Sequence, residues 1–219
     1  MTRHAAILFD MDGTILTSIP AVERAWTGWA ARVGVPATEV LDHLHGRRAI
    51  DTVRRFAPAG ADIATEAAWV DAAELADTDG VAPIDGAAEL LSALGDGQWA
   101  VVTSAIRALA LVRIEAAGLP LPKVLIAAED VQHGKPDPEG FLLGAARLGV
   151  DIADCLVFED TDAGLQAGRR AGAQVIRVAG PHHSQQEQDT PAIRSYRDLD
   201  INVDADGIAV RHRQASGAV

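Results

Sequence analysis

Two aspartates, Asp10 and Asp12, end an apolar run over residues 5–9 and precede Gly13 and Thr14. Such a run is typical of a strand buried on both faces of a parallel sheet. Residues two apart in a strand point to the same side, so the two carboxylates would lie together. They would raise each other's proton affinity unless a cation lay between them. An Asp-capped turn is the plainer interpretation of Asp-x-Asp alone. In this context the pair predicts a metal site with a nucleophilic and a proton-carrying carboxylate.

Three further groups of reactive or ligating residues follow predicted strands. Thr103 and Ser104 follow the strand 99–102, Lys135 lies beyond the strand 124–127, and Glu159 and Asp160 follow the strand 155–158. Two of these groups have an ordinary interpretation when taken alone, since Thr-Ser often begins a helix and a lone lysine is usually a surface charge. Ligands of open parallel sheets, however, bind beyond the carboxyl ends of the strands. The convergence of all four groups at that edge predicts one active site.

This set of side chains is suited to hydrolysis of a phosphate monoester, because phosphoryl transfer depends mainly on positioning and charge neutralisation. We expect Asp10 to attack phosphorus and form an aspartyl-phosphate. Asp12 is expected to protonate the departing alkoxide and later to deprotonate the attacking water. Thr103 or Ser104 would bind a phosphoryl oxygen, and Lys135 would supply a fixed positive charge.

Carboxylates and a phosphate together suit Mg²⁺. Asp10 and Asp160 are expected to bind Mg²⁺ directly, together with the backbone carbonyl of Asp12. Glu159 is expected to act through water or through its contacts with the direct ligands. Asp162 is an alternative to Asp160 or a support for it, and the sequence leaves both possibilities open.

Short apolar strands alternate with helices along most of the chain. Strands are predicted over 5–9, 99–102, 124–127, 155–158 and 174–178, and helices over 87–94, 107–117, 139–148 and 163–171. This alternation indicates an α/β fold with a doubly wound parallel sheet. Asp85 is the predicted cap of the helix 87–94. His182 and His183 are predicted to lie in a solvated loop, and residues 204–207 to form a hairpin turn.

A helical insertion interrupts the sheet after its first strand. A helix is predicted from Pro20 to Val33, where Gly34 ends it. Three more helices are predicted near 38–44, up to 56 and over 65–76. We expect residues 1–16 and 80–219 to form the α/β catalytic core, and residues 17–79 to form a small four-helix cap domain. Trp26 and Trp29 are expected to face the core of that cap.

The composition excludes several classes of function. The chain has 219 residues, of which 48% are hydrophobic, and a formal net charge of −12. A globular protein is therefore expected, and a nucleic-acid partner is not, because nucleic-acid phosphates require a basic surface. No apolar stretch approaches the roughly 20 residues that cross a bilayer, so no membrane association is expected. The single Cys155 permits no internal disulfide, and no leader-like segment is recognisable, so a cytoplasmic location is expected.

The stretch Phe9-Asp10-Met11-Asp12-Gly13-Thr14 resembles the first motif of the haloacid dehalogenase superfamily of phosphatases, and the three later groups match its other motifs. The chain is more narrowly similar to the hexitol, glycerol phosphate and 2-deoxyglucose-6-phosphate phosphatases, a likeness that includes the cap stretches 21–26 and 45–50. The resemblance implies a Mg²⁺-dependent phosphatase whose partner is a small phosphorylated metabolite, a sugar or a polyol. The chain is expected to be a monomer or a weak dimer.

Specificity is expected to come from the cap, because the core contacts only the phosphate. His45, Arg47 and Arg48 follow a predicted helix and would face the mouth of the cleft if the cap resembles its relatives. A solvated basic helix start is the competing interpretation. Arg107 is a weaker candidate, and the identity of the sugar or polyol stays open.

Three other functions share these motifs in part. A β-phosphoglucomutase-like phosphotransferase would have the same nucleophile, but those mutases place a histidine in the first cap linker and an arginine near the position of Ala49. Here the linker over residues 17–20 has no histidine, and Ala49 is not basic. A dehalogenase would lack the second aspartate, which Asp12 supplies. A non-enzymatic regulator on the same scaffold is disfavoured because all four motifs are chemically intact.

Overall fold

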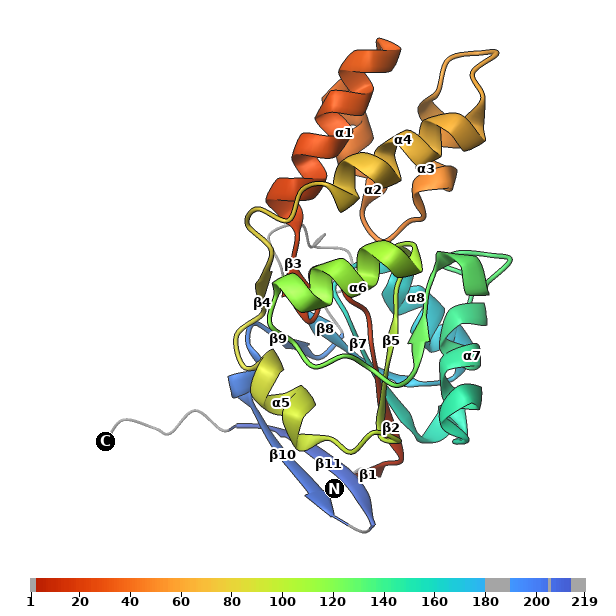
Figure 1. Ribbon diagram of the computed structural model, residues 1–219. Coiled ribbons are helices and arrows are strands. Elements are labelled where there is room, and N and C mark those ends of the chain that lie inside the picture. The colour runs from red at the N-terminus through yellow and green to blue at the C-terminus, as the bar shows by residue number, and fades with distance from the viewer. Residues whose placement is uncertain (1–2, 180–189, 205, 214–219) are drawn as a thin grey trace.

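Within residues 3–179, 190–204 and 206–213, which the computed structural model describes, a six-stranded sheet with only parallel pairings forms the centre of the molecule (Figure 1). In spatial order its strands are β6 Leu125–Ile126, β5 Trp99–Val102, β2 Ala6–Phe9, β7 Cys155–Glu159, β8 Gln174–Val178 and β9 Ala192–Ile193. The predicted α/β class with a parallel sheet is confirmed.

Strand β2 lies in the middle of this sheet because its side chains are apolar. All of residues 6–9 are fully buried. Phe9 lies opposite Val101 of β5 and Phe158 of β7, so these three strands end at nearly the same level. Asp10 therefore emerges between the ends of two neighbouring strands. Glu159 is the last residue of β7, and not the first residue after it as the sequence suggested.

Helices cover both faces of the sheet. They are α5 Ala87–Ala93 and α6 Arg107–Ala116 on one face, and α7 Glu139–Leu148 and α8 Asp162–Ala171 on the other. Alternate residues of β2 enter different cores: Ile7 and Phe9 pack with α5 and α6, whereas Ala6 and Leu8 pack with α7 and α8. Burying one large apolar side chain contributes about 1.5–3 kcal/mol, so this alternation keeps both faces covered.

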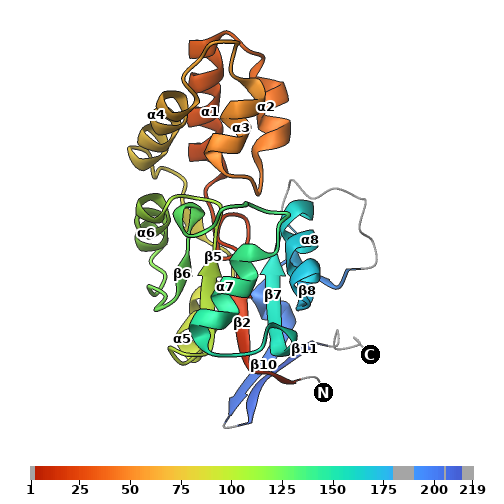
Figure 2. The ribbon, with the colours of Figure 1, turned by 90° about the vertical axis from the view of Figure 1, so that its right-hand side faces the viewer.

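Four helices form a separate group beyond the carboxyl ends of the strands (Figures 1 and 2). They are α1 Ile19–Val33, α2 Ala37–Leu44, α3 Ala49–Phe56 and α4 Ile63–Leu75. The group has its own apolar core, in which Trp26 and Trp29 are buried as expected. Gly34 ends α1 with a φ of 77°, a conformation that favours glycine. We propose that residues 17–79 are a cap domain on a core of residues 1–16 and 80–219.

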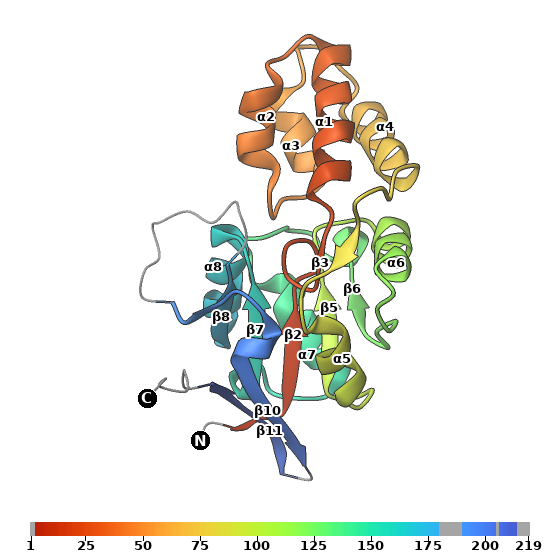
Figure 3. The ribbon, with the colours of Figure 1, turned by 90° about the vertical axis from the view of Figure 1, so that its left-hand side faces the viewer.

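Two short strands join this helical group to the rest of the chain. They are β3 Leu16–Thr17 and β4 Ala82–Pro83, which pair antiparallel at the start and the end of the insertion. Figure 3 shows them between the helices and the main sheet. The two chain crossings therefore lie side by side.

A second sheet lies at the end of the molecule farthest from α1–α4 (Figure 3). It contains β1 Arg3–His4, β11 Gly207–His212 and β10 Leu199–Asp204, all antiparallel. Asp204 pairs with Gly207, so the predicted hairpin is confirmed. Three 3-10 turns complete the described structure: η1 Ala128–Asp130, η2 Ile152–Asp154 and η3 Tyr196–Asp198. His182 and His183 lie outside the described residues.

A search of the described residues finds no helix with the length and apolar character of a membrane span.

Candidate active site

Lys135 lies between two buried carboxylates at the end of β2. Its Nζ donates to Oδ1 of Asp10, and to Oε1 of Glu159 at 2.8 Å. The side chains of all three residues are less than a tenth exposed. Lys135 comes from the loop before α7, so the fold brings together groups more than 100 residues apart. A positive charge thus lies beside Asp10, the residue that the sequence analysis predicts to be the nucleophile.

Burial dominates the electrostatics of this cluster. It raises the pKa of Asp10 to about 7, although Lys135 works in the opposite direction. Burial and the charges of Glu159 and Asp10 raise the pKa of Asp160 well above its usual range. The pKa of Lys135 is raised, since the attraction of two carboxylates outweighs burial, so its ammonium keeps its proton. Three carboxylates thus lie near a single lysine, so the negative charge of the cluster exceeds its positive charge.

The acids of this cluster fit a divalent cation. Oxygens of Asp10, Glu159 and Asp160 lie within 4.8 Å of one another. Oδ1 of Asp160 is buried and has no hydrogen-bond partner among the described residues, an arrangement that costs free energy unless a cation binds there. Gly13, with a φ of 83°, leaves space for this side chain, because a Cβ would lie 2.0 Å from Oδ2 of Asp160. Carboxylate oxygens are the ligands that Mg²⁺ prefers.

Glu159 and Asp162 have other partners. Oε2 of Glu159 accepts from the backbone N–H and the hydroxyl of Thr161, at 2.6 and 2.9 Å, while Oε1 accepts from Lys135. Both oxygens are thus occupied, which favours the indirect role expected for Glu159. Asp162 accepts from Arg177 at 2.6 Å, and Arg177 also donates to the backbone carbonyl of Asp160. Arg177 thus links Asp162 to the backbone of Asp160, an arrangement that favours a supporting role for Asp162.

Asp12 is held by two donors away from this cluster. Ser18 Oγ donates to Oδ1 of Asp12 at 2.6 Å. Nη1 of Arg113 lies 3.1 and 3.2 Å from the two oxygens of the same carboxylate. Arg113 was missed in the sequence analysis. The sequence feature that could have identified it is a charged residue on the buried face of α6, three residues after the fully buried Ala110.

Thr103 and Ser104 use their hydroxyl groups differently. Ser104 Oγ donates to the backbone carbonyl of Gly46, in the loop between α2 and α3, at 3.0 Å. Thr103 Oγ1 accepts from the N–H of Ala105 at 3.1 Å, which leaves its hydroxyl proton for a phosphoryl oxygen. Of the two candidates, Thr103 is better placed to donate to phosphate.

A cavity of about 480 Å³ connects these residues to the helical group. Its walls include Asp10, Asp12, Thr103, Ser104 and Asp160 from the sheet edge, and Trp26, His45, Arg47 and Asp71 from α1–α4 and their loops. His45 and Arg47 therefore lie at the cavity as expected. Asp71 was not predicted; burial and the charge of Glu129, across the cavity, raise its pKa to about 6.

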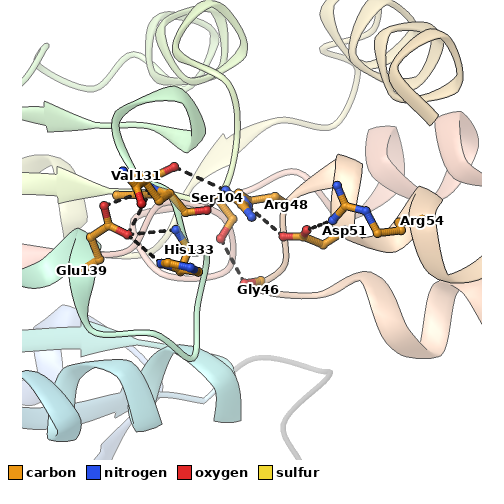
Figure 4. Close-up of polar contacts among 9 residues, drawn as sticks. Gly46, Arg48, Asp51, Arg54, Ser104, Val131, His133 and Glu139 are labelled. Carbon is orange, nitrogen blue, oxygen red and sulfur yellow. Dashed lines mark hydrogen bonds and ion pairs between the residues drawn. The ribbon is translucent and has the colours of Figure 1, made fainter. Parts of the chain in front are cut away.

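Arg48 also borders the cavity, but its guanidinium donates hydrogen bonds both to the helical group and to the core (Figure 4). It donates to the carbonyl of Gln132 at 3.0 Å and to Asp51 at 2.7 Å. Residue 132 belongs to the loop that leads to Lys135. Arg107, the weaker substrate candidate, pairs with Asp130 and does not line the cavity.

Asp10 lies at the carboxyl end of the central parallel strand, beneath an inserted helical group, which is where open α/β sheets bind their ligands. The chain belongs to the haloacid dehalogenase-like hydrolases, whose family model matches residues 4–172.

Relatives with assigned activities are similar over most of their length. The chain is 44% identical to hexitol phosphatase A of Escherichia coli K12 over 183 residues, which is 82% of this chain and 85% of that protein. It is 38% identical to glycerol-1-phosphate phosphohydrolase 2 of Saccharomyces cerevisiae, over 80% of this chain and 74% of that protein. The β-phosphoglucomutase of Clostridium difficile has the same fold, with a TM-score of 0.78 at 20% identity over 90% of this chain and 93% of that chain.

Proposed function

We propose that this protein hydrolyses small phosphorylated sugars or polyols, in a Mg²⁺-dependent reaction that passes through an aspartyl-phosphate on Asp10. The reaction class follows from the family, whose similar members are phosphatases, so the chain is a phosphoric monoester hydrolase. The observation that carries the mechanism is the buried Asp10 beside Lys135 and Asp160, at the floor of a cavity that also contains Asp12 and Thr103.

The first half of the reaction transfers the phosphoryl group to the enzyme. An oxygen of Asp10 bonds to phosphorus as the bond from phosphorus to the alcohol oxygen breaks. Asp12 gives its proton to that oxygen, and the alcohol leaves. Lys135 and the hydroxyl of Thr103 stabilise the charge on the phosphoryl oxygens.

The second half returns the enzyme to its starting state. Asp12 removes a proton from water, whose oxygen bonds to phosphorus while the bond to Asp10 breaks. Inorganic phosphate and the free carboxylate of Asp10 result. Asp10, Asp160 and the backbone carbonyl of Asp12 would hold Mg²⁺, which supplies positive charge for the phosphate and the acid cluster.

The alcohol part of the substrate would occupy the cavity beneath α1–α4. Its wall combines apolar side chains such as Trp26 with the carboxylate of Asp71 and the basic side chains His45 and Arg47. Acceptors and donors of this kind suit a chain of hydroxyl groups. The hexitol and glycerol phosphates of the similar phosphatases are compounds of this class.

The mutase alternative is not favoured by the linker before α1. Ser18 occupies this linker and donates to Asp12, and none of residues 17–20 is a histidine. The similarity to β-phosphoglucomutase is one of fold. A regulator without activity is disfavoured because the acids and the lysine expected for the reaction lie together.

The test is phosphate release from a panel of phosphorylated hexitols, hexoses, glycerol and glycolate. We expect release with Mg²⁺, loss of release with EDTA and recovery on adding Mg²⁺ back. Asp10→Asn should abolish turnover in a protein that stays folded. Unchanged turnover in this variant would rule out the covalent route, and activity in EDTA would rule out the metal.

A further inference from the structure

The guanidinium of Arg113 joins two acids that belong to different parts of the fold. One nitrogen, Nη1, contacts both oxygens of Asp12, at 3.1 and 3.2 Å. The other, Nη2, lies 3.3 Å from Oε1 of Glu74, in the last turn of α4. Arg113 itself is on α6 of the core. The contact therefore runs from the cap, through a core helix, to the residue that transfers protons.

The end of this connection at Arg113 and Glu74 is buried, whereas the side chain of Asp12 is 30% exposed toward the cavity. The side chain of Arg113 is 3% exposed and that of Glu74 is 8% exposed. All three residues border the cavity between α4 and α6. Buried charges of this kind persist only when each one is paired, so each member restricts where the others can lie. Arg113 also holds α4 against α6, two helices in direct contact.

We propose that Arg113 is a positioning residue for Asp12, and that Glu74 makes this positioning depend on the cap helix α4. The inference rests on the proposed function, in which Asp12 transfers the protons. Arg113 touches neither the phosphate nor the attacking oxygen in this scheme. It fixes the carboxylate of Asp12 in one place, and α4 must be seated for Glu74 to hold Arg113.

A positioning role can be separated from a structural one through the leaving group. A polyol leaves as an alkoxide that needs the proton of Asp12, whereas p-nitrophenolate and acetate leave without one. The value of kcat/KM reports the steps through departure of the leaving group. A misplaced Asp12 therefore lowers kcat/KM for polyol phosphates and has little effect on p-nitrophenyl phosphate or acetyl phosphate. A general loss of folded protein lowers all values equally.

The experiment compares Arg113→Lys with wild type on the best polyol phosphate and on the two activated phosphates. Lysine keeps the charge but is a single point, so it cannot contact Asp12 and Glu74 from two nitrogens. We expect kcat/KM for the polyol phosphate to fall about 10- to 100-fold, and the values for the activated phosphates to fall less than about threefold. Equal losses on all substrates, or a gain on the polyol phosphate, would overturn the inference.

Glu74→Gln tests the connection to the cap. We expect a smaller loss with the same dependence on the leaving group, and a loss in the double variant that is less than the product of the two single losses. If the loss in the double variant equals the product of the two single losses, Glu74 does not act through Arg113. If Arg113→Lys does not fold, as judged by circular dichroism, Glu74→Gln alone decides by the same comparison.

Two further variants complete the design. Arg24→Lys alters another arginine–aspartate pair at the base of the cap, Arg24 with Asp77 at 2.7 Å, which does not contact Asp12. Any change in kcat/KM that this variant causes should be the same for all substrates. Asp12→Asn should itself show the dependence on the leaving group. If it does not, the proposed function has failed; if it does and Arg113→Lys does not, only the present inference has failed.

Discussion

Lys135 is the residue on which the charge balance of the site depends. It contacts both Asp10 and Glu159, and the side chains of all three residues are less than a tenth exposed. Removing one member of a buried ionic network is far more damaging than removing a surface charge, because the remaining charges lose their compensation. In the proposed mechanism the same residue also serves the chemistry, since the phosphoryl group would bring further negative charge to Asp10.

Lys135→Met should therefore lose both turnover and stability. We expect kcat to fall at least 100-fold and the free energy of unfolding to fall by about 3–5 kcal/mol. Phosphate release and urea unfolding measure the two effects. Lys123→Met is the control, because Lys123 pairs with Asp96 on the surface and should lose less than about 1 kcal/mol. A Lys135 variant with wild-type kcat would contradict the assigned role.

Asp12→Asn should separate the two halves of the reaction. An amide cannot remove a proton from water, so the aspartyl-phosphate on Asp10 should persist. Rapid-quench labelling with an activated phosphate, which needs no proton to leave, is expected to show label on the protein for longer than in wild type. The parallel sample of Asp10→Asn should show no label. Label on Asp10→Asn would place the nucleophile elsewhere.

The raised pKa of Asp10 predicts how stability depends on pH. Its usual value is 3.8, and burial raises the pKa to about 7 in the folded protein. Between these values the folded state holds a proton that the unfolded state has released. The contribution of Asp10 to the free energy of unfolding is therefore fully present below pH 3.8 and is lost as the pH rises through 7. Burial raises the pKa of Glu74 to about 7 as well, so Glu74 also contributes stability that is lost as the pH rises.

In EDTA, the Tm should therefore fall between pH 5 and pH 8. Mg²⁺ competes with protons for Asp10 and Asp160, so it should raise the Tm more at pH 8 than at pH 5. At 100 times its Kd a ligand adds about 2.7 kcal/mol, or roughly 5–10 °C for a chain of this size. Thermal unfolding with and without Mg²⁺ measures this. An effect of Mg²⁺ that is equal at both pH values would argue against these ligands.

At the scale of elements, the sequence predicts the bounds of a helix or strand correctly where those bounds depend only on residues within that element. The strands 99–102 and 174–178 and the helix 139–148 have the predicted bounds. Asp85 shows where this fails. Gly86 occupies the N-cap of α5, with a φ of 80°, and the side chain of Asp85 instead accepts from Ser195 and Arg197. A partner 110 residues away leaves no local signal.

The same reason explains which site residues the sequence analysis missed. Asp10, Lys135 and Asp160 each follow a predicted strand, so the rule for parallel sheets was enough to bring them together. Arg113, Glu74 and Asp71 lie inside helices. Their function depends on which helix faces which, and helical spacing alone does not contain that information.

The loop between α2 and α3 makes a testable contact with the core through Arg48. Arg48 and Arg54 both pair with Asp51, at 2.7 and 2.8 Å, but only Arg48 continues to the carbonyl of Gln132 (Figure 4). Arg48→Met should weaken closure of the cap, with kcat/KM about tenfold lower for every substrate. Arg54→Met is the matched control and should stay within about twofold. Steady-state kinetics decides, and equal effects of the two variants would dismiss the contact.

At the scale of the whole molecule, the proposed function assigns the chemistry and the choice of substrate to different parts of the chain. The groups proposed to bind phosphate follow β2, β5 and β7 or lie in the loop before α7, all outside the helical insertion. The groups that face the rest of the cavity come largely from the helical insertion. A change in the insertion can therefore alter which alcohol is accepted without altering how phosphorus is attacked.

His45 and Arg47 provide the corresponding prediction. Both line the cavity on the cap side, away from the cluster of Asp10 and Lys135. Replacing either by alanine should change the ratio of kcat/KM between hexitol and glycerol phosphates by up to about tenfold, since one lost hydrogen bond is worth roughly 0.5–1.5 kcal/mol. The inhibition constant of inorganic phosphate, which contacts only the core, should change less than twofold. A uniform loss on all substrates, together with weaker phosphate binding, would move specificity to other residues of the cavity, of which Asp71 is the first to examine.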